Sequence, residues 1–369
     1  MNEEIGSEFW ISHLAKQYLN SNPEWLNSWG NVVLTSSGRG AISLMLKHIE
    51  VNVRSKIALL PAYICESIIV PFIRAGYRCY FYDVDNQLRP NEESIERLLG
   101  KDIGVFLHMG YFGFSTNSNL HYYINQLKER GTIIVEDITH TLYSKYRRYD
   151  ENDYYIASLR KWMGLPSGGF LASKKYDICD INIKGVRECV TVQLDFFVIR
   201  LEALLLKGKY IVSKNYRLKQ RYLDLFKKAE DILDNNPNFY LIDGISLSMV
   251  KTINLDELVR KRKENFGILL KCIKNFKDIQ PVFDMITDDV CPLFFPVYVK
   301  EREKLRKFLI TKKIYCPVHW PVPSQLNIIN YPLSRKVYEC ILSIPCDQRY
   351  SVEDMFRIIE VISDYFDMS

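Results

Sequence analysis

The sequence lacks a hydrophobic run long enough to cross a membrane. Apolar stretches such as FFPVYV at 294–299 fall far short of the roughly 20 residues that a membrane-spanning helix needs. The first ten residues, MNEEIGSEFW, are acidic and do not resemble a secretory signal peptide. We therefore expect a cytoplasmic protein with no membrane partner.

Cysteine and histidine motifs for disulfides or metal ions are also missing. The nine cysteines include no CxxC pair, and the six histidines include no HExxH or HxH. An odd cysteine count without a secretion signal favours reduced thiols. The sequence therefore predicts no disulfide framework and no metal site.

Neither sign of charge is in large excess. Lysine and arginine number 49 against 44 aspartates and glutamates, and the densest basic run, KRK at 261–263, lies beside Glu257 and Glu264. Such a mixture is typical of a solvated helix face, so we expect no nucleic-acid partner. Hydrophobic residues at 47% and charged residues at 25% match ordinary globular composition, which excludes a disordered or fibrous chain.

Short β-branched or aromatic runs alternate with helix-length amphipathic segments from about residue 31 onward. Examples are NVVLTSS before GAISLMLKHIEV, KIALLPAY before ESIIVPFIRAGY, and IGVFLHM before NSNLHYYINQLKERG. This alternation indicates βαβ units on a parallel sheet covered on both faces. We predict three parts: an N-terminal arm at 1–30, a large α/β domain at 31–235 and a small C-terminal α+β domain at 236–369.

Reactive residues follow three of the predicted strands, at the edge where ligands bind in open α/β sheets. The first strand runs into Ser37, Gly38 and Arg39 at a helix start, where small residues and the helix dipole suit a phosphate. Asp137 follows the buried run IIV, although a helix-capping role would also explain it. A later strand, YYIAS, delivers Ser158 and, shortly after, Lys161 to a turn before two glycines.

Together these three sites match the needs of a pyridoxal phosphate (PLP) enzyme. The cofactor's phosphate needs a helix N-terminus and hydroxyl groups, the pyridine nitrogen needs a carboxylate, and the aldehyde needs an amine for a Schiff base. A dinucleotide dehydrogenase would need only the first of the three sites. The sequence therefore favours PLP as the cofactor.

These motifs resemble the DegT/StrS family of fold-type I PLP aminotransferases, over nearly the whole chain. VEDITHTLY is similar to the family's strand that ends in Glu-Asp, and SLRKWMGLPSGG to its Ser…Lys…Gly-Gly segment. The resemblance implies a large domain with a mixed, mostly parallel seven-stranded sheet. It further implies that Lys161 binds the cofactor aldehyde, that Asp137 holds the ring nitrogen, that His140 contacts the ring, and that Ser158 contacts the phosphate.

Two positions depart from the family pattern. Ser37-Gly38-Arg39 stands where the family has Ser-Gly-Thr, so Arg39 replaces a phosphate-binding hydroxyl or blocks it. Cys65 stands where a ring usually stacks on the cofactor, which leaves Tyr63, or a ring from 111–112, as the substitute. The expected cofactor-binding residues are therefore Ser37, Gly38, Arg39, Tyr63, His140 and Ser158.

The resemblance implies an aminotransferase that moves an amino group from glutamate to a nucleotide-linked keto sugar, working as a homodimer. Two alternatives from the same fold are a sugar dehydratase, which would carry His at the position of Lys161, and a non-catalytic relative. A nucleotide-dependent oxidoreductase is a third alternative, but the second strand is followed by Ala62 and Tyr63 rather than by the expected acid.

Overall fold

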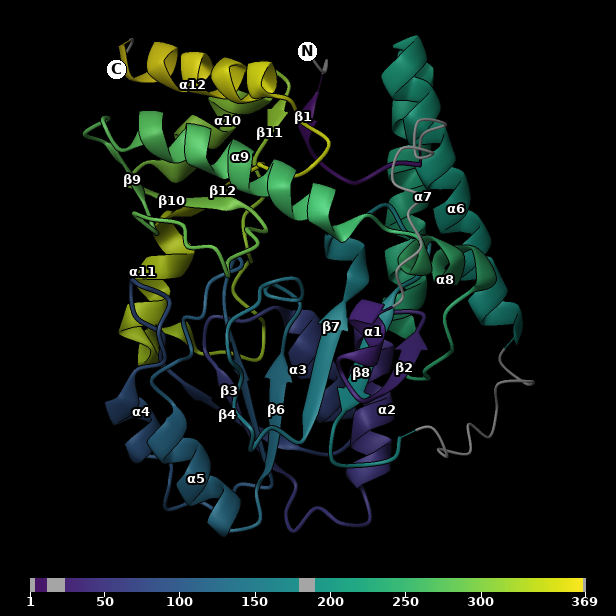
Figure 1. The fold of residues 1–369 in the computed structure, drawn as a ribbon, viewed down its shortest axis with the longest axis vertical. Coiled ribbons are helices and arrows are strands. Elements are labelled where there is room, and N and C mark those ends of the chain that lie inside the picture. Colours follow the sequence, from purple (N-terminus) through teal and green to yellow (C-terminus); the bar gives the residue numbers. More distant parts are fainter. Residues whose placement is uncertain (1–3, 12–23, 179–189, 368–369) are drawn as a thin grey trace.

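The computed structural model describes residues 4–11, 24–178 and 190–367. Its centre is a seven-stranded sheet in which β8 is antiparallel to both of its neighbours and the other pairs are parallel. The predicted mixed, mostly parallel seven-stranded sheet is thus confirmed (Figure 1). In spatial order its strands are β2 (Asn31–Thr35), β8 (Gly169–Ser173), β7 (Tyr154–Ser158), β6 (Ile133–Asp137), β5 (Val105–Met109), β3 (Ile57–Pro61) and β4 (Arg78–Tyr82).

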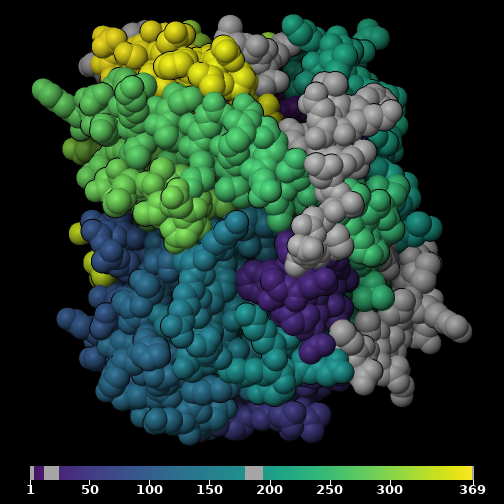
Figure 2. All heavy atoms as spheres, viewed as in Figure 1, coloured from purple at the N-terminus to yellow at the C-terminus, as the bar shows by residue number. Residues whose placement is uncertain are grey.

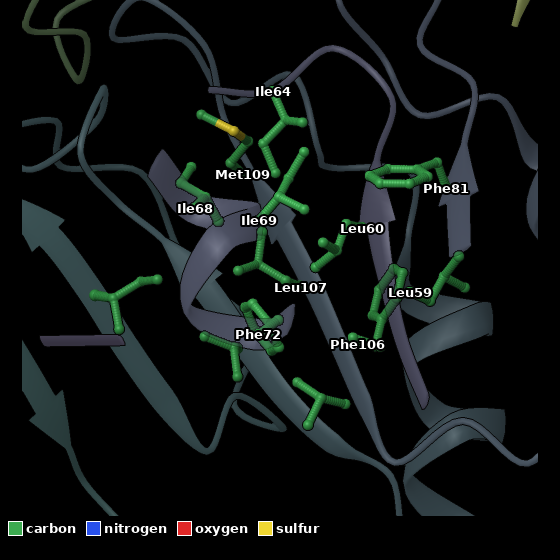
Figure 3. Packing of buried hydrophobic residues seen from close by; sticks show 14 of the residues in the cluster. Leu59, Leu60, Ile64, Ile68, Ile69, Phe72, Phe81, Phe106, Leu107 and Met109 are labelled. Carbon is green, nitrogen blue, oxygen red and sulfur yellow. The ribbon is translucent and has the colours of Figure 1, made fainter. Parts of the chain in front are cut away.

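Helices on the two faces of this sheet explain why its central strands are buried throughout. All five residues of β5, VFLHM, are buried, as expected for a strand covered on both faces. Figure 3 shows Leu107 and Met109 of β5 packed with Ile69 and Phe72, which come from the helix after β3. The short helices of this domain are α1 (Glu24–Asn27), α2 (Gly38–Ile49), α3 (Glu66–Arg74), α4 (Glu92–Glu96) and α5 (His121–Glu129).

The C-terminal part forms a separate antiparallel sheet with its own hydrophobic core, in the order β12 (Ile341–Ile344), β10 (Phe295–Val299) and β9 (Ile279–Pro281). A two-stranded parallel sheet joins the N-terminal segment to it, because β1 (Ile5–Gly6) pairs with β11 (Ile314–Tyr315). The remaining elements are α9 (Leu255–Ile273), α10 (Arg302–Thr311), α11 (Pro332–Cys340) and α12 (Val352–Asp367).

Two long helices, α6 (Val190–Ser213) and α7 (Tyr216–Asn235), lie side by side along one flank of both parts (Figures 1 and 2). Near its start, α7 contacts the N-terminal segment through Lys219 Nζ, which lies 2.5 Å from Glu4 Oε1. Near its end, Asp234 pairs with Arg39 of α2 at 2.8 Å. The helix α7 therefore contacts both the N-terminal segment and the start of α2.

Residues after α7 return to the large sheet before the small domain begins. The backbone N–H of Ser36 donates to the Tyr240 carbonyl at 2.8 Å, and that of Ile242 donates to the Leu34 carbonyl at 3.0 Å. The helix that follows, α8 (Gly244–Lys251), contributes Val250 to the core cluster that contains Phe170 of β8. The division of the chain at residue 235 stays a prediction.

No helix in the described ranges is both long and apolar enough to cross a membrane. All seven cysteines in the same ranges are free thiols, and three of them, Cys291, Cys316 and Cys346, are buried.

Candidate active site

A cavity of about 510 Å³ lies where the large sheet, the small domain and the α6–α7 pair meet. Its wall contains residues from the carboxyl ends of strands, as predicted for an open α/β sheet. The structure brings together six of the eight predicted site residues there: Gly38, Arg39, Asp137, His140, Ser158 and Lys161.

The start of α2 forms one part of the wall. Ser37 caps this helix because its side-chain oxygen accepts a hydrogen bond from the Gly40 N–H at 3.1 Å. The first N–H groups of a helix have no acceptor within it and point toward a ligand at this end. A Cβ at Gly38 would lie 3.2 Å from the Ser158 Cβ, so the glycine keeps the space beside Ser158 open. Ser37 itself is a helix cap and does not line the cavity.

Asp137 is a buried carboxyl at the end of β6, 2% exposed. Burial raises its pKa to about 6, against the effect of the Thr139 N–H, which donates to its Oδ1 at 2.7 Å. In the described part of the chain it has no salt bridge. The neighbouring Glu136 is held instead by Arg148 and Asn152, because successive strand residues point to opposite faces. A buried carboxyl without a cation is suited to bind a protonated ring nitrogen.

Lys161 lies in a short 3₁₀ turn, Leu159–Lys161, that links β7 to β8. The next residue, Trp162, is fully buried and fixes the turn by donating from Nε1 to the Thr139 carbonyl at 2.8 Å. Lys161 itself is exposed to the cavity, and within the described ranges its side chain makes no hydrogen bond or ion pair. Its amine is therefore available to a ligand.

The second of the two glycines after this turn, Gly169, is required for a steric reason. A Cβ at Gly169 would lie only 2.0 Å from the Ser37 carbonyl oxygen, so β8 can pass the start of α2 only with glycine at this position. This close contact sets β8, and with it the turn that carries Lys161, next to the start of α2.

His140 is completely buried and neutral. Its Nδ1 accepts a hydrogen bond from the Phe112 N–H at 3.3 Å, which assigns the ring proton to Nε2. Nε2 is buried without a partner in the described part of the chain. Burial, together with Lys161, lowers its pKa to about 3. His140 therefore offers an unused N–H donor in the cavity wall.

Tyr63 does not line the cavity. Its hydroxyl donates to the His319 carbonyl, and its ring packs against Tyr111 and Tyr338 behind the wall. Cys65 does line the cavity, so the ring that the sequence analysis expects in its place has to come from elsewhere. One ring that lines the cavity is Trp320, whose centroid lies 5.2 Å from that of His140, and Phe294 and Tyr315 line the cavity as well.

Sequence reasoning missed several residues of the wall because they come from distant segments. Thr139 had a local signal: an Asp followed two residues later by a backbone N–H donor is a common turn motif. Trp320 lies in the segment HWPVP at 319–323, and no local pattern there indicates that its ring reaches the cavity. Glu8 of the N-terminal segment, Arg200 of α6 and Glu230 of α7 had no local signal.

These features fit PLP. The start of α2 with the open space at Gly38 suits a phosphate, the unpaired Asp137 suits the ring nitrogen, and Lys161 suits the aldehyde. The buried Nε2 of His140 is a polar atom whose partner would have to be a ligand. The fold and the site thus have the features that suit PLP bound at the carboxyl ends of a mostly parallel sheet.

Comparison with known sequences gives a partial match. No family model matches the chain. The dTDP-3-amino-3,6-dideoxy-alpha-D-galactopyranose transaminase of Aneurinibacillus thermoaerophilus is 28% identical over 163 residues. The match spans 42% of this chain and only 42% of that relative.

Comparison with solved structures covers almost the whole chain. Spr1654 of Streptococcus pneumoniae, in its PLP form, matches with a TM-score of 0.67 at 14% identity, over 97% of each chain. A DegT/DnrJ/EryC1/StrS aminotransferase of Brucella abortus matches with a TM-score of 0.62 at 15% identity, over 95% of this chain and 92% of that one. The chain therefore has the fold-type I fold of these aminotransferases, and the predicted resemblance to the DegT/StrS family is confirmed for the fold.

Proposed function

We propose that this protein is a PLP-dependent aminotransferase that acts on a sugar. The observation that carries the proposal is the meeting of Lys161, Asp137 and the start of α2 in one cavity, on a fold shared with Spr1654, which is described as a putative sugar aminotransferase. A dehydratase of this fold would lack the lysine. An oxidoreductase would have no use for a buried, unpaired carboxyl beside a free amine.

Each of the three groups has a defined task. Bound PLP would supply a ring that accepts an electron pair from the substrate carbon. The free amine of Lys161 would hold the cofactor and, once released, take a proton from the substrate carbon and return it. Asp137, as a carboxylate, would keep the proton on the ring nitrogen, and the N–H of His140 would contact the ring. Apolar wall residues, such as the buried Ile156 and the partly buried Phe294, would keep water away.

We further propose glutamate as the amino donor and a nucleotide-linked keto sugar as the acceptor. The matched relative is named for a dTDP-linked amino sugar, which supports a nucleotide sugar here. The cavity also contains Arg39, Arg160 and Arg200, the side chains that a diphosphate would need. Arg221, in contrast, pairs with Glu202 and is not part of the cavity wall.

The half-reactions test the donor and the acceptor separately. Glutamate alone is expected to convert the lysine-bound cofactor to its amine form, seen as loss of visible absorbance. A nucleotide-linked keto sugar should restore that absorbance at least about tenfold faster than the same sugar without its nucleotide, because the remote diphosphate positions the ketone. If simple 2-keto acids restored it fastest and no nucleotide sugar did, the sugar assignment would be wrong.

We also propose that the active form is a homodimer, as in other fold-type I proteins. The apolar side chains exposed on the single chain, such as Ile73 and Val51, are compatible with a covered face. Light scattering at working concentration should give twice the mass of one chain. A monomer with full activity would contradict this proposal.

A further inference from the structure

Three arginines from three separate elements converge on one glutamate in the cavity. Arg160, next to Lys161, approaches Glu230 Oε1 at 2.8 Å, and Arg200 of α6 approaches the same oxygen at 3.1 Å. Arg39 of α2 lies 3.2 Å from Oε2. All four side chains line the cavity. We call these four residues the arginine cluster.

Two of the three arginines in the cluster also have a second, more exposed acidic partner, and Arg160 does not. Arg200 is only 5% exposed, and burial together with the nearby Arg160 lowers its pKa to about 10. Two further acids, Glu8 on Arg200 and Asp234 on Arg39, are more than half exposed. Within the described ranges Arg160 pairs with Glu230 alone, and its buried Nε has no partner.

Glu230 is the most accessible member of the cluster, with 38% of its side chain exposed. Although burial opposes ionisation, the three guanidinium groups hold its pKa well below the ordinary value, so it is a carboxylate at neutral pH. The Glu230 carboxylate thus occupies the point where the three guanidinium groups meet. The start of α2 beside it favours the binding of a further anion.

We propose that Arg39, Arg160 and Arg200 form a subsite for a phosphate group, and that Glu230 is the internal anion which this phosphate displaces. One guanidinium group can donate two parallel hydrogen bonds to two oxygens of a phosphate. A phosphate dianion also carries more negative charge to the three arginines than the single carboxylate of Glu230. The phosphate has two possible sources, the cofactor and the diphosphate of the substrate. The choice between these sources rests on the proposed function, whereas the subsite itself does not.

Binding of inorganic pyrophosphate to the cofactor-free protein, measured by titration calorimetry, tests the subsite. Glu230→Gln is expected to bind pyrophosphate about tenfold more tightly, because it removes a negative charge a few ångströms from the ligand while keeping its shape. Glu202→Gln is the matched control. Glu202 is 39% exposed and pairs with Arg221 across the same two helices, and its change should leave binding as it is.

A second pair of variants covers the case in which Glu230→Gln fails to fold. Arg160→Gln should weaken pyrophosphate binding about tenfold, whereas Arg221→Gln should not change it. Equal affinities in Arg160→Gln and the unchanged protein, or no gain in a folded Glu230→Gln, would overturn the subsite.

Repeating the titration on protein with PLP fixed to Lys161 by borohydride distinguishes the two sources. If the gain in Glu230→Gln persists in the loaded protein, the subsite takes the substrate's diphosphate. If PLP abolishes pyrophosphate binding and pyridoxal, which lacks the phosphate, does not, the subsite takes the cofactor's phosphate. Failure of PLP to attach to Lys161 would contradict the proposed function, and the cofactor-free titration would still decide the subsite.

Discussion

Lys161→Ala is expected to fold normally, to lose the visible absorbance of lysine-bound PLP, and to lose turnover by a factor on the order of 10⁴. The fold should be retained because Lys161 is exposed and makes no hydrogen bond or ion pair within the described ranges, while the buried Trp162 fixes the turn. Turnover should fall this far because the variant loses both the attachment point and the proton carrier. Absorbance spectra and a coupled transaminase assay measure the two effects.

The place of attachment gives a sharper test of the same prediction. Borohydride followed by peptide mapping should leave the cofactor on Lys161. The main competitor is Lys207. Burial and the nearby Arg349 lower the pKa of Lys207 to about 7, which makes its amine reactive near neutral pH. Lys207 is held by Ser7 Oγ at 2.8 Å and is almost fully buried. A label on Lys207 would show that we have chosen the wrong lysine. Lys251→Ala, an exposed change on α8, is the control and should keep the label and the rate.

Asp137→Asn is expected to lower the transamination rate by a factor of about 10² to 10⁴ and to weaken PLP binding much less. The amide keeps the shape of the side chain but removes the charge that holds the proton on the ring nitrogen. Single-turnover rates with glutamate and a binding titration with PLP separate the two effects. Near-normal rates would mean that another group holds the ring proton. The neighbouring carboxylate, Glu136, is poorly placed for this role because it points to the opposite face and pairs with Arg148.

The same variant should be more stable than the unchanged protein when no cofactor is bound. The folded-state pKa of Asp137, about 6, lies above the ordinary value of 3.8, so the protonated form favours folding and the ionised form opposes it. This favourable contribution is complete below pH 3.8 and is lost as the pH rises through 6. A shift of about two pKa units corresponds to about 3 kcal/mol at pH 7.5.

Denaturant unfolding of the cofactor-free proteins at pH 7.5 and pH 4 measures this difference. The excess stability of Asp137→Asn should be large at pH 7.5 and mostly gone at pH 4. A pH-independent difference would show that Asp137 is not a desolvated carboxyl. Lower activity combined with higher stability is the pattern expected of a residue kept for function rather than for folding.

The sequence by itself determined the parts of this protein that depend on near neighbours in the chain. The alternation of apolar strands and amphipathic helices predicts a parallel sheet covered on both faces, because such strands require buried runs such as IIV before Asp137. The number of seven strands came from the family resemblance. The position of a residue directly after a strand predicts that it reaches the ligand edge. For that reason Asp137, Lys161 and Ser158 could be chosen without a structure.

Only the tertiary structure decided which distant residues complete the cavity. Tyr63 and Cys65 are two positions apart in the chain, but only Cys65 lines the cavity. The Tyr63 ring lies behind the wall because its hydroxyl donates to the His319 carbonyl, a contact that no local pattern indicates. Trp320 then reaches the cavity from the small domain. Glu230 meets three arginines from elements up to 191 positions away in the chain. Local periodicity carries no information about such contacts, because they form only when α6 and α7 pack along the flank of both domains.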